Sequence, residues 1–223
     1  MLPRVVMHNV MSVDGRLDFV PADIELYYEL ASRWKVNAIM SGSGTIMAAA
    51  DHMPAPSGDE PDERRSRDPR DRRPLLVVPD SRGRVRDWKP WLDQPYWRDV
   101  VVICSDSTPG PYLRRLEKDS IDSIVAGKGH VDMRRALEEL NSKYAVRNVR
   151  LDSGGTLNGV LLRAGLVDEV SVLVHPALVG GTSPSSVFTA PDLSSASGVV
   201  DLKIKHVEKL RSGYVWLRYT VVR

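Results

Sequence analysis

Two short glycine-rich segments have the composition of phosphate-binding turns. Gly42-Ser43-Gly44-Thr45 follows the apolar run Ala38–Met40, and Gly154-Gly155-Thr156 follows Val149–Leu151. Glycine lets the main chain approach a ligand closely, and the N–H groups that open a helix attract phosphate. Two such turns at the ends of neighbouring strands can hold both phosphates of a dinucleotide. Steric need alone also explains a glycine at a strand–helix junction, so both readings stay open. Neither turn matches G-x-G-x-x-G, which disfavours a Rossmann fold.

The segments around these turns alternate between strand-like and helix-like patterns. Runs rich in Val and Ile predict strands, and apolar residues at helical spacing predict helices between them. Asp23 and Asp132 are placed to cap two of these helices, and Gly165 to follow the end of a third, over residues 156–164. The expected strands are Val5–Val10, Ala38–Met40, Leu75–Val78, Val100–Cys104, Ile121–Val125, Val149–Leu151, Val170–Val174 and a terminal hairpin of Lys203–Lys209 with Val215–Val222.

Strands separated by helices of this length imply crossover connections and a largely parallel sheet. The terminal hairpin adds antiparallel strands, so we expect an α/β fold with a mixed, mostly parallel sheet flanked by helices, in one domain over residues 1–223. Residues 54–73 do not fit such a core, because they hold four prolines and dense charge. We expect a charged, mobile surface loop there. Its acidic and basic residues balance, which argues against an arm that binds nucleic acid.

Composition and charge limit the classes of protein that remain. Hydrophobic residues make up 42% of the chain and charged residues 27%, as in ordinary globular proteins. A net charge of +2 gives no reason to expect nucleic acid or an anionic membrane as partner. The sequence predicts no signal segment and no membrane span, so we expect a cytoplasmic protein. Cys104 and His8 are expected in the core, and the five histidines lack the spacing of a metal site.

Five sequence blocks occur in an order that carries a family resemblance. They are Asn9–Arg16, Asn37–Thr45, Leu151–Gly159, Gly165–Val170 and Pro176–Gly181, and they span most of the chain from Val5 to Gly181. In this order they resemble the motifs of the riboflavin-biosynthesis pyrimidine reductases. The resemblance implies a three-layer fold like that of dihydrofolate reductase and a homodimer. It also implies an enzyme that uses NADPH to reduce the ribosyl group of a phosphoribosylamino-pyrimidine to ribityl.

The same resemblance implies roles for particular residues. Asn9, Met11, Ser12 and Asp14 are expected where nicotinamide and substrate meet, and Asp152 takes the place of a substrate-side glutamate. The residues expected to line the cofactor are Gly42, Ser43, Gly44, Thr45, Gly154, Gly155, Thr156 and Leu157.

In the implied reaction the side chains need only to align the cofactor with the substrate and to supply one proton. The cofactor carries the hydride from its nicotinamide C4 to the ribose C1, and the protein must align the two carbons. A carboxylic acid or a water supplies the proton, which makes Asp14 and Asp152 the catalytic candidates. Asp14 can instead be a turn residue before Gly15, and Asp152 a helix N-cap.

Two stretches differ from the family pattern or stand outside it. Ala48-Ala49-Ala50-Asp51 stands where the family has an Asp-Asp-Pro motif, so Ala49 replaces the first aspartate and Asp51 is the remaining candidate for substrate binding. Ser81 and Arg82, with other arginines nearby, can contact the 2′-phosphate that distinguishes NADPH from NADH, although a solvated loop is the alternative. Residues 127–130 can border the adenosine end. Two other functions stay open: a reductase of another small pterin, carbonyl or imine, and a nucleotide-binding module without catalysis.

Overall fold

The computed structural model describes residues 1–50, 66, 68, 70–182 and 185–223, which form two compact units. Unit 1 comprises Met1–Pro3 and Val36–Val149, and unit 2 comprises Arg4–Lys35 and Arg150–Arg223. Strand β6 (Asn148–Leu151) carries the chain from unit 1 into unit 2. The expectation of a single domain stays a prediction, and most of the charged segment 54–73 lies outside the described residues. Over the described ranges, no helix is long and apolar enough to cross a membrane.

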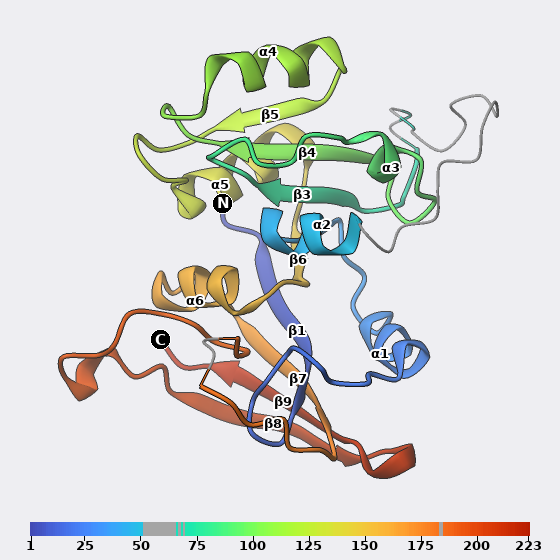
Figure 1. Ribbon diagram of the computed structural model, residues 1–223, viewed down its shortest axis with the longest axis vertical. Helices are drawn as coiled ribbons and strands as arrows, with labels where there is room; N and C mark the ends of the chain where they lie inside the picture. The colour runs from blue at the N-terminus through green and yellow to red at the C-terminus, as the bar shows by residue number, and fades with distance from the viewer. Residues whose placement is uncertain (51–65, 67, 69, 183–184) are drawn as a thin grey trace. The chain divides into compact units, whose positions relative to one another are not determined.

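Unit 1 contains four parallel strands in the spatial order β5-β4-β3-β2 (Figure 1). The residues of β2, β3 and β4 are nearly all apolar and mostly buried, as is typical of parallel strands covered on both faces, whereas in the outermost strand β5 only Ile124 is buried. The elements of this unit are β2 (Ala38–Met40), α2 (Ser43–Ala50), β3 (Leu75–Pro79), α3 (Lys89–Leu92), β4 (Asp99–Cys104), α4 (Gly110–Lys118), β5 (Asp122–Val125) and α5 (Met133–Tyr144).

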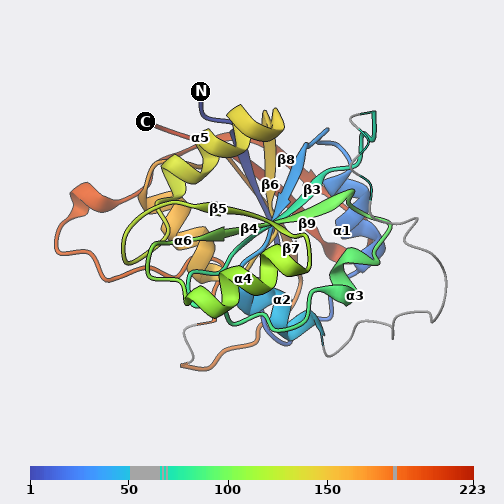
Figure 2. The same cartoon turned by 90° about the horizontal axis from the view of Figure 1, so that it is seen from above.

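Helices cover both faces of the unit 1 strands. Leu76 and Val78 of β3 belong to a core cluster with Ile46 of α2, Trp91 of α3 and Leu116 of α4. Figure 2 shows α5 on the opposite side of the strands from α2 and α4. The buried residues of α5 follow helical spacing and explain why this helix packs on one face: they are Met133, Ala136, Leu137 and Leu140.

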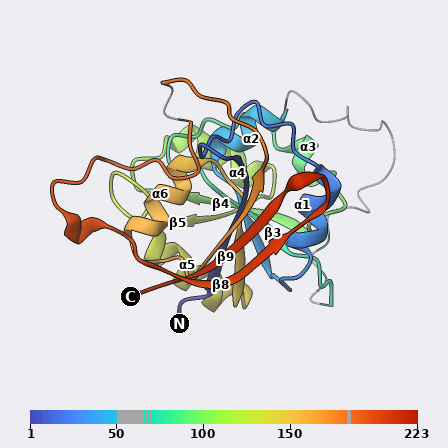
Figure 3. The same ribbon diagram turned by 90° about the horizontal axis from the view of Figure 1, so that it is seen from below.

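Unit 2 combines parallel and antiparallel pairing. Strand β1 pairs with β7 in parallel, β7 pairs with β9 antiparallel, and β9 forms the hairpin with β8 that Figure 3 shows side by side. The terminal hairpin predicted from the alternating pattern is therefore confirmed. The elements are β1 (Arg4–Ser12), α1 (Ile24–Ala31), α6 (Gly155–Arg163), β7 (Glu169–His175), η1 (Ala196–Gly198), β8 (Leu202–Lys209), η2 (Arg211–Gly213) and β9 (Val215–Val221).

The two helices of unit 2 lie on opposite sides of β1 (Figure 1). Successive side chains of a strand point to opposite faces, so the neighbouring residues His8 and Asn9 of β1 face different helices. The His8 ring stacks on Tyr27 of α1, with ring centroids 4.5 Å apart. The Asn9 Oδ1 accepts a hydrogen bond of 3.0 Å from Asn158 Nδ2 of α6. These two contacts fix α1 and α6 against the end of β1.

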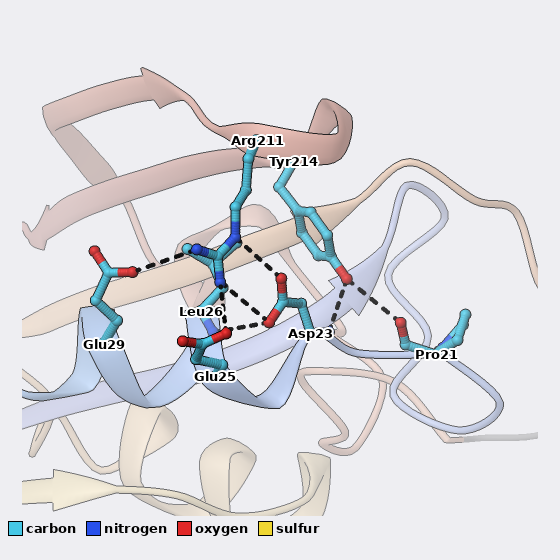
Figure 4. Close-up of polar contacts among 7 residues, drawn as sticks. All are labelled: Pro21, Asp23, Glu25, Leu26, Glu29, Arg211 and Tyr214. Carbon is cyan, nitrogen blue, oxygen red and sulfur yellow. Dashed lines mark hydrogen bonds and ion pairs between the residues drawn. The ribbon is translucent and has the colours of Figure 1, made fainter.

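The N-terminus of α1 is held by the connection between β8 and β9 (Figure 4). The Asp23 carboxylate caps the helix by accepting a 2.9 Å hydrogen bond from Leu26 N. Arg211 Nε lies 3.2 Å from the other Asp23 oxygen, and the Tyr214 hydroxyl accepts from Asp23 N at 2.9 Å. The predicted cap at Asp23 is thus confirmed. The cap at Asp132, whose carboxylate accepts from Arg135 N, is confirmed as well.

Candidate active site

The carboxyl ends of the four parallel strands in unit 1 form one rim. Loops that follow parallel strands at a common edge are the usual ligand sites of open α/β sheets. Arg84 Nη2, after β3, donates a 2.7 Å hydrogen bond to Ser43 Oγ, which lies at the start of α2. Thr108 Oγ1, after β4, donates to Ser81 O at 2.8 Å. A main-chain hydrogen bond from Asp106 N joins the loops after β4 and β5.

The first glycine turn opens directly into α2. The helix begins at Ser43, and the Gly42 carbonyl already accepts from Ile46 N at 3.0 Å. A Cβ placed on Gly44 would find only Arg84 Nη2, at 4.0 Å, within contact range. No described part of the protein therefore requires a glycine at this position. The start of α2 thus combines open space at Gly44 with a helix N-terminus and a nearby guanidinium group, a combination that suits phosphate.

The second glycine turn is sterically constrained. Gly154 is the N-cap residue of α6, and Gly155 is the first residue of the helix. A Cβ on Gly155 would lie 2.0 Å from Ser186 O and 2.6 Å from Thr189 Oγ1. Steric need therefore accounts for Gly155, because the segment containing Ser186 and Thr189 runs directly against α6.

Asp152 lies between a phenol and a guanidinium group at the end of β6. Tyr27 Oη lies 2.9 Å from Asp152 Oδ1, and Arg150 Nη2 lies 3.6 Å from Oδ2. The Asp152 side chain is 27% exposed, so the carboxyl reaches the surface of unit 2. Burial raises the pKa of Asp152, and the charge of Arg150 offsets part of this effect. A carboxyl group with a raised pKa is better suited to donate a proton than one with an ordinary pKa. The N-cap alternative for Asp152 is wrong, because Gly154 occupies that position.

Asp14 has a different environment. Its Oδ1 accepts hydrogen bonds from Ser12 Oγ at 2.6 Å and Val179 N at 3.0 Å, and its Oδ2 accepts from Gly180 N at 2.7 Å. These bonds, that from Ser12 first, lower the pKa of Asp14 well below its ordinary value of 3.8. The following Gly15 has φ +79°, as an Asp-Gly turn requires. Asp14 is thus an ionised acceptor that fastens the turn after β1 to the loop after β7.

The other expected residues near the end of β1 have mostly structural partners. Asn9 Nδ2 donates to Ser153 O at 2.8 Å, which fastens β1 to the turn before α6. Ser12 is buried and bonded to Asp14 and Arg16. Met11 is partly buried. Asp51 lies outside the described residues, so its expected contact with substrate stays a prediction.

Residues set aside as unreactive in the sequence are packed in the core. His8 is fully buried, and burial lowers its pKa to about 4. Cys104 is also fully buried, and burial raises the pKa of its thiol to about 11. Neither side chain is thus available as a nucleophile or base near neutral pH. Both expectations from the sequence are confirmed.

A model of the RibD C-terminal domain matches residues 3–216. The chain belongs to this family. Similar proteins of known name include the 2,5-diamino-6-ribosylamino-4(3H)-pyrimidinone 5′-phosphate reductases of Methanothermobacter thermautotrophicus, 27% identical over 99% of both chains, and of Archaeoglobus fulgidus, 28% identical over 96% of both. Among solved structures, RibD of Acinetobacter baumannii matches 99% of this chain with a TM-score of 0.73 and 21% identity. The chain spans 58% of that RibD chain.

The RibD family assignment confirms the resemblance read from the five sequence blocks, and the structural match confirms the fold like that of dihydrofolate reductase. The structure also shows what some residues of these sequence blocks contact. Asp168 and Glu169, for example, hold β1: Asp168 accepts from Val5 N at 2.8 Å, and the buried Glu169 pairs with Arg4. The two glycine turns lie in different units, Gly44 in unit 1 and Gly155 in unit 2. The expectation that they meet at one cofactor therefore stays a prediction.

Two residues that contact Asp152 escaped the sequence analysis. Tyr27 lies in the helix that Asp23 was expected to cap, and Arg150 lies in the expected strand Val149–Leu151, but neither residue was expected to have a function. Their partner Asp152 is 125 residues from Tyr27, so no local spacing connects them. The one available signal was a tyrosine on a buried helix face, because a buried phenol hydroxyl needs a hydrogen-bond partner.

Proposed function

We propose that this protein is an NADPH-dependent reductase of riboflavin biosynthesis, which converts the ribosyl side chain of a phosphoribosylamino-pyrimidine to ribityl. The observation that carries the proposal is the full-length match to two archaeal proteins that bear this reductase name. The match to the Methanothermobacter protein covers 99% of this chain and so spans the segments that hold both glycine turns and both candidate carboxyl groups. Family membership implies a nicotinamide cofactor in general, and the preference for NADPH belongs to the proposal.

The rim of unit 1 fits one end of such a cofactor. Gly42, Ser43, Gly44 and Thr45 would hold a phosphate at the start of α2, where Gly44 leaves space and Arg84 supplies positive charge. The exposed Arg82 and the Ser81 main chain belong to the loop after β3 and would face the 2′-phosphate of NADPH. The residues proposed to contact the cofactor in unit 2 are Gly154, Gly155, Thr156 and Leu157.

The substrate end of the site belongs to unit 2 in this proposal. A bound nicotinamide cofactor supplies the hydride, and the protein aligns the substrate and donates a proton. We assign the proton to Asp152, because this carboxyl has a raised pKa and a surface-exposed edge. The pKa of Asp14 is instead lowered, so we assign Asp14 a structural role. In this role it holds the loop after β7, which forms a wall of the proposed site. Asn9, Met11 and Ser12 complete that wall.

Turnover with defined substrates tests this function. The protein is incubated with NADPH and either 2,5-diamino-6-ribosylamino-4(3H)-pyrimidinone 5′-phosphate or its deaminated uracil counterpart. The expected result is oxidation of NADPH together with a product that has gained two hydrogen atoms in its sugar. NADPH that binds but is not oxidised with either pyrimidine would overturn the proposal and favour a reductase of another substrate. NADPH that binds but is not oxidised with any acceptor tried would favour the nucleotide-binding module.

One observation favours a different substrate as second candidate. Ala49 stands where the family has a substrate-contacting aspartate, and its side chain packs against the core cluster of unit 1. This position cannot supply a carboxylate to the substrate. If Asp51 does not replace it, a pterin or another small carbonyl or imine becomes the better substrate. Faster NADPH oxidation with a dihydropterin than with either pyrimidine phosphate would establish this alternative.

The assembly and cell compartment complete the proposal. The family resemblance supports a homodimer, and we keep the cytoplasm, which the sequence pattern predicted, as the proposed compartment. Light scattering of the purified protein at assay concentration tests the first point, with twice the mass of the 24.8 kDa chain as the expected result.

A further inference from the structure

The hydroxyl group of Tyr27 lies between two oxygen atoms in unit 2. Its Oη is 3.0 Å from the main-chain oxygen of His8 and 2.9 Å from Asp152 Oδ1. Tyr27 itself is buried, so water has little access to these contacts. Both distances are within hydrogen-bond range, and two full two-centre hydrogen bonds at these contacts need two hydrogen atoms.

Counting hydrogens shows which state of Asp152 satisfies both contacts. A phenol has one hydrogen to donate, and a main-chain carbonyl can only accept. If Asp152 is ionised, it also only accepts, and one of the two contacts has no hydrogen. If Asp152 is protonated, its O–H donates to Tyr27 Oη and the Tyr27 O–H donates to His8 O. Only the protonated carboxyl gives every oxygen pair a hydrogen bond.

We propose that Tyr27 is a positioning residue for the reaction, which accepts a hydrogen bond from the protonated Asp152 carboxyl and so stabilises and orients the acid that serves the substrate. This inference rests on the proposed reductase activity. It adds a residue that the family motifs in the sequence did not include. It also assigns the direction of the hydrogen bond, which the distance alone does not give.

The charged and titratable groups around the pair act on Asp152 in opposite directions. Burial raises the pKa of Asp152, whereas the Arg150 guanidinium on β6 favours the ionised form. The ring of His8, stacked on Tyr27 from β1, has a pKa lowered to about 4 by burial and is neutral near neutral pH. Burial raises the pKa of Tyr27 far above its ordinary value, so the phenol keeps its own hydrogen. Tyr28 meets the Tyr27 ring edge-on.

The position of Tyr27 is fixed from two directions. His8 Nε2 lies 3.3 Å from the Tyr27 main-chain oxygen, which ties the middle of α1 to β1. The start of α1 is held by the Asp23 cap and by Arg211 and Tyr214 (Figure 4). A hydroxyl on a helix held in this way stays in place when the carboxyl loses its proton. It is then ready to receive the same hydrogen bond when Asp152 is protonated again.

The substitution Tyr27→Phe tests the direction of the bond. It removes the acceptor of the Asp152 proton and leaves the carboxyl in place. We expect the basic limb of the kcat–pH profile to move to lower pH by about half a unit to one unit, the equivalent of one hydrogen bond. KM should change less than about twofold, because Tyr27 acts through Asp152. A limb that moves to higher pH, as loss of a bond donated to the carboxylate would give, or that does not move, would overturn the proposal.

A second measurement does not depend on activity. The Asp152 carboxyl is titrated by ¹³C NMR in the full-length protein, with its signal assigned through Asp152→Asn. In Tyr27→Phe its pKa should fall by the same about half a unit to one unit. If the wild-type protein reduces no pyrimidine, the proposed function fails, and this titration still decides on Tyr27. An unchanged or raised pKa contradicts the hydrogen-bond direction even in an active enzyme.

Two matched variants control for the loss of a tyrosine hydroxyl. Tyr144→Phe removes a Tyr–Asp hydrogen bond of 3.1 Å in unit 1, where Tyr144 Oη donates to Asp122 Oδ2. Tyr28→Phe removes the hydroxyl of the next residue on α1, whose side chain is largely exposed. Both should leave the pH limb and the Asp152 titration unchanged. In an Asp152→Asn background, Tyr27→Phe should have little further effect on kcat, because the two residues act as one unit. Full additivity in this cycle would also overturn the proposal.

Discussion

The two glycine turns should respond in opposite ways to the smallest possible side chain. At Gly155 a Cβ would stand 2.0 Å from Ser186 O and 2.6 Å from Thr189 Oγ1, which no side-chain rotation can relieve. Overpacking of this kind costs about 1–3 kcal/mol, and we expect Gly155→Ala near the upper end because the nearest atom belongs to the main chain. At Gly44 the new Cβ would meet only Arg84 Nη2 at 4.0 Å. Because Gly44 lies in the first turn of α2, alanine there should stabilise the fold by up to about 0.5 kcal/mol.

At Gly44 the effect on NADPH affinity should be opposite to the effect on stability, because a substitution that stabilises the fold should weaken binding of the cofactor. If the main chain at Gly44 approaches a phosphate of NADPH, even one methyl group interferes, and a valine interferes more. We expect Gly44→Ala to weaken NADPH binding about tenfold, which is about 1.4 kcal/mol, and Gly44→Val to weaken it further. Urea unfolding gives the stability of each variant, and calorimetric titration with NADPH gives the affinity. The reasoning is refuted if Gly44→Ala destabilises the fold while NADPH affinity is unchanged, or if Gly155→Ala is as stable as the wild type.

Three further substitutions test the remaining parts of the site. Arg84→Ala should weaken NADPH binding about tenfold or more while Arg86→Ala, in the same loop, does not; equal losses in a fluorescence titration would contradict the role of Arg84. Asp152→Asn should lower kcat about a hundredfold with little change in KM, and an unchanged kcat in steady-state assays would exclude Asp152 as the acid. Asp14→Asn should lower the melting temperature near neutral pH, because the folded state lowers the pKa of Asp14 and is stabilised by its ionised form above the ordinary value of 3.8. The difference between wild type and Asp14→Asn should begin to shrink as the pH falls below that value and should vanish only in strong acid, below the lowered pKa of Asp14 in the folded state. A difference that does not shrink as the pH falls from neutral into strong acid would contradict this explanation.

The elements of the fold were predictable because the signals are local. The cap residues Asp23 and Asp132 predict where two helices begin, and both carboxylates accept the expected main-chain hydrogen bond. The alternating pattern of residues 203–222 predicted a hairpin whose strands β8 and β9 differ from the expected bounds by one residue at most. By contrast, the four-residue helix α3 was not predicted, because Lys89–Leu92 is too short to show a helical period.

The chemistry of the site was less accessible, because it depends on contacts between distant residues. The sequence offered two explanations for each glycine turn, and only the neighbours in space distinguish them: Ser186 explains Gly155, whereas nothing comparable explains Gly44. The two carboxyl candidates also could not be ranked from the sequence. Asp14 receives main-chain N–H groups from Val179 and Gly180, far along the chain, and these hydrogen bonds favour its ionised form.

A crystal structure of the protein with NADPH bound is the most direct measurement of whether one cofactor unites the two glycine turns. We predict that its phosphates contact the main chain at Gly42–Thr45 and at Gly154–Leu157, and that the nicotinamide C4 faces the Asp152 carboxyl. A cofactor whose phosphates touch neither turn, or whose nicotinamide lies away from Asp152, would contradict the proposed reductase site.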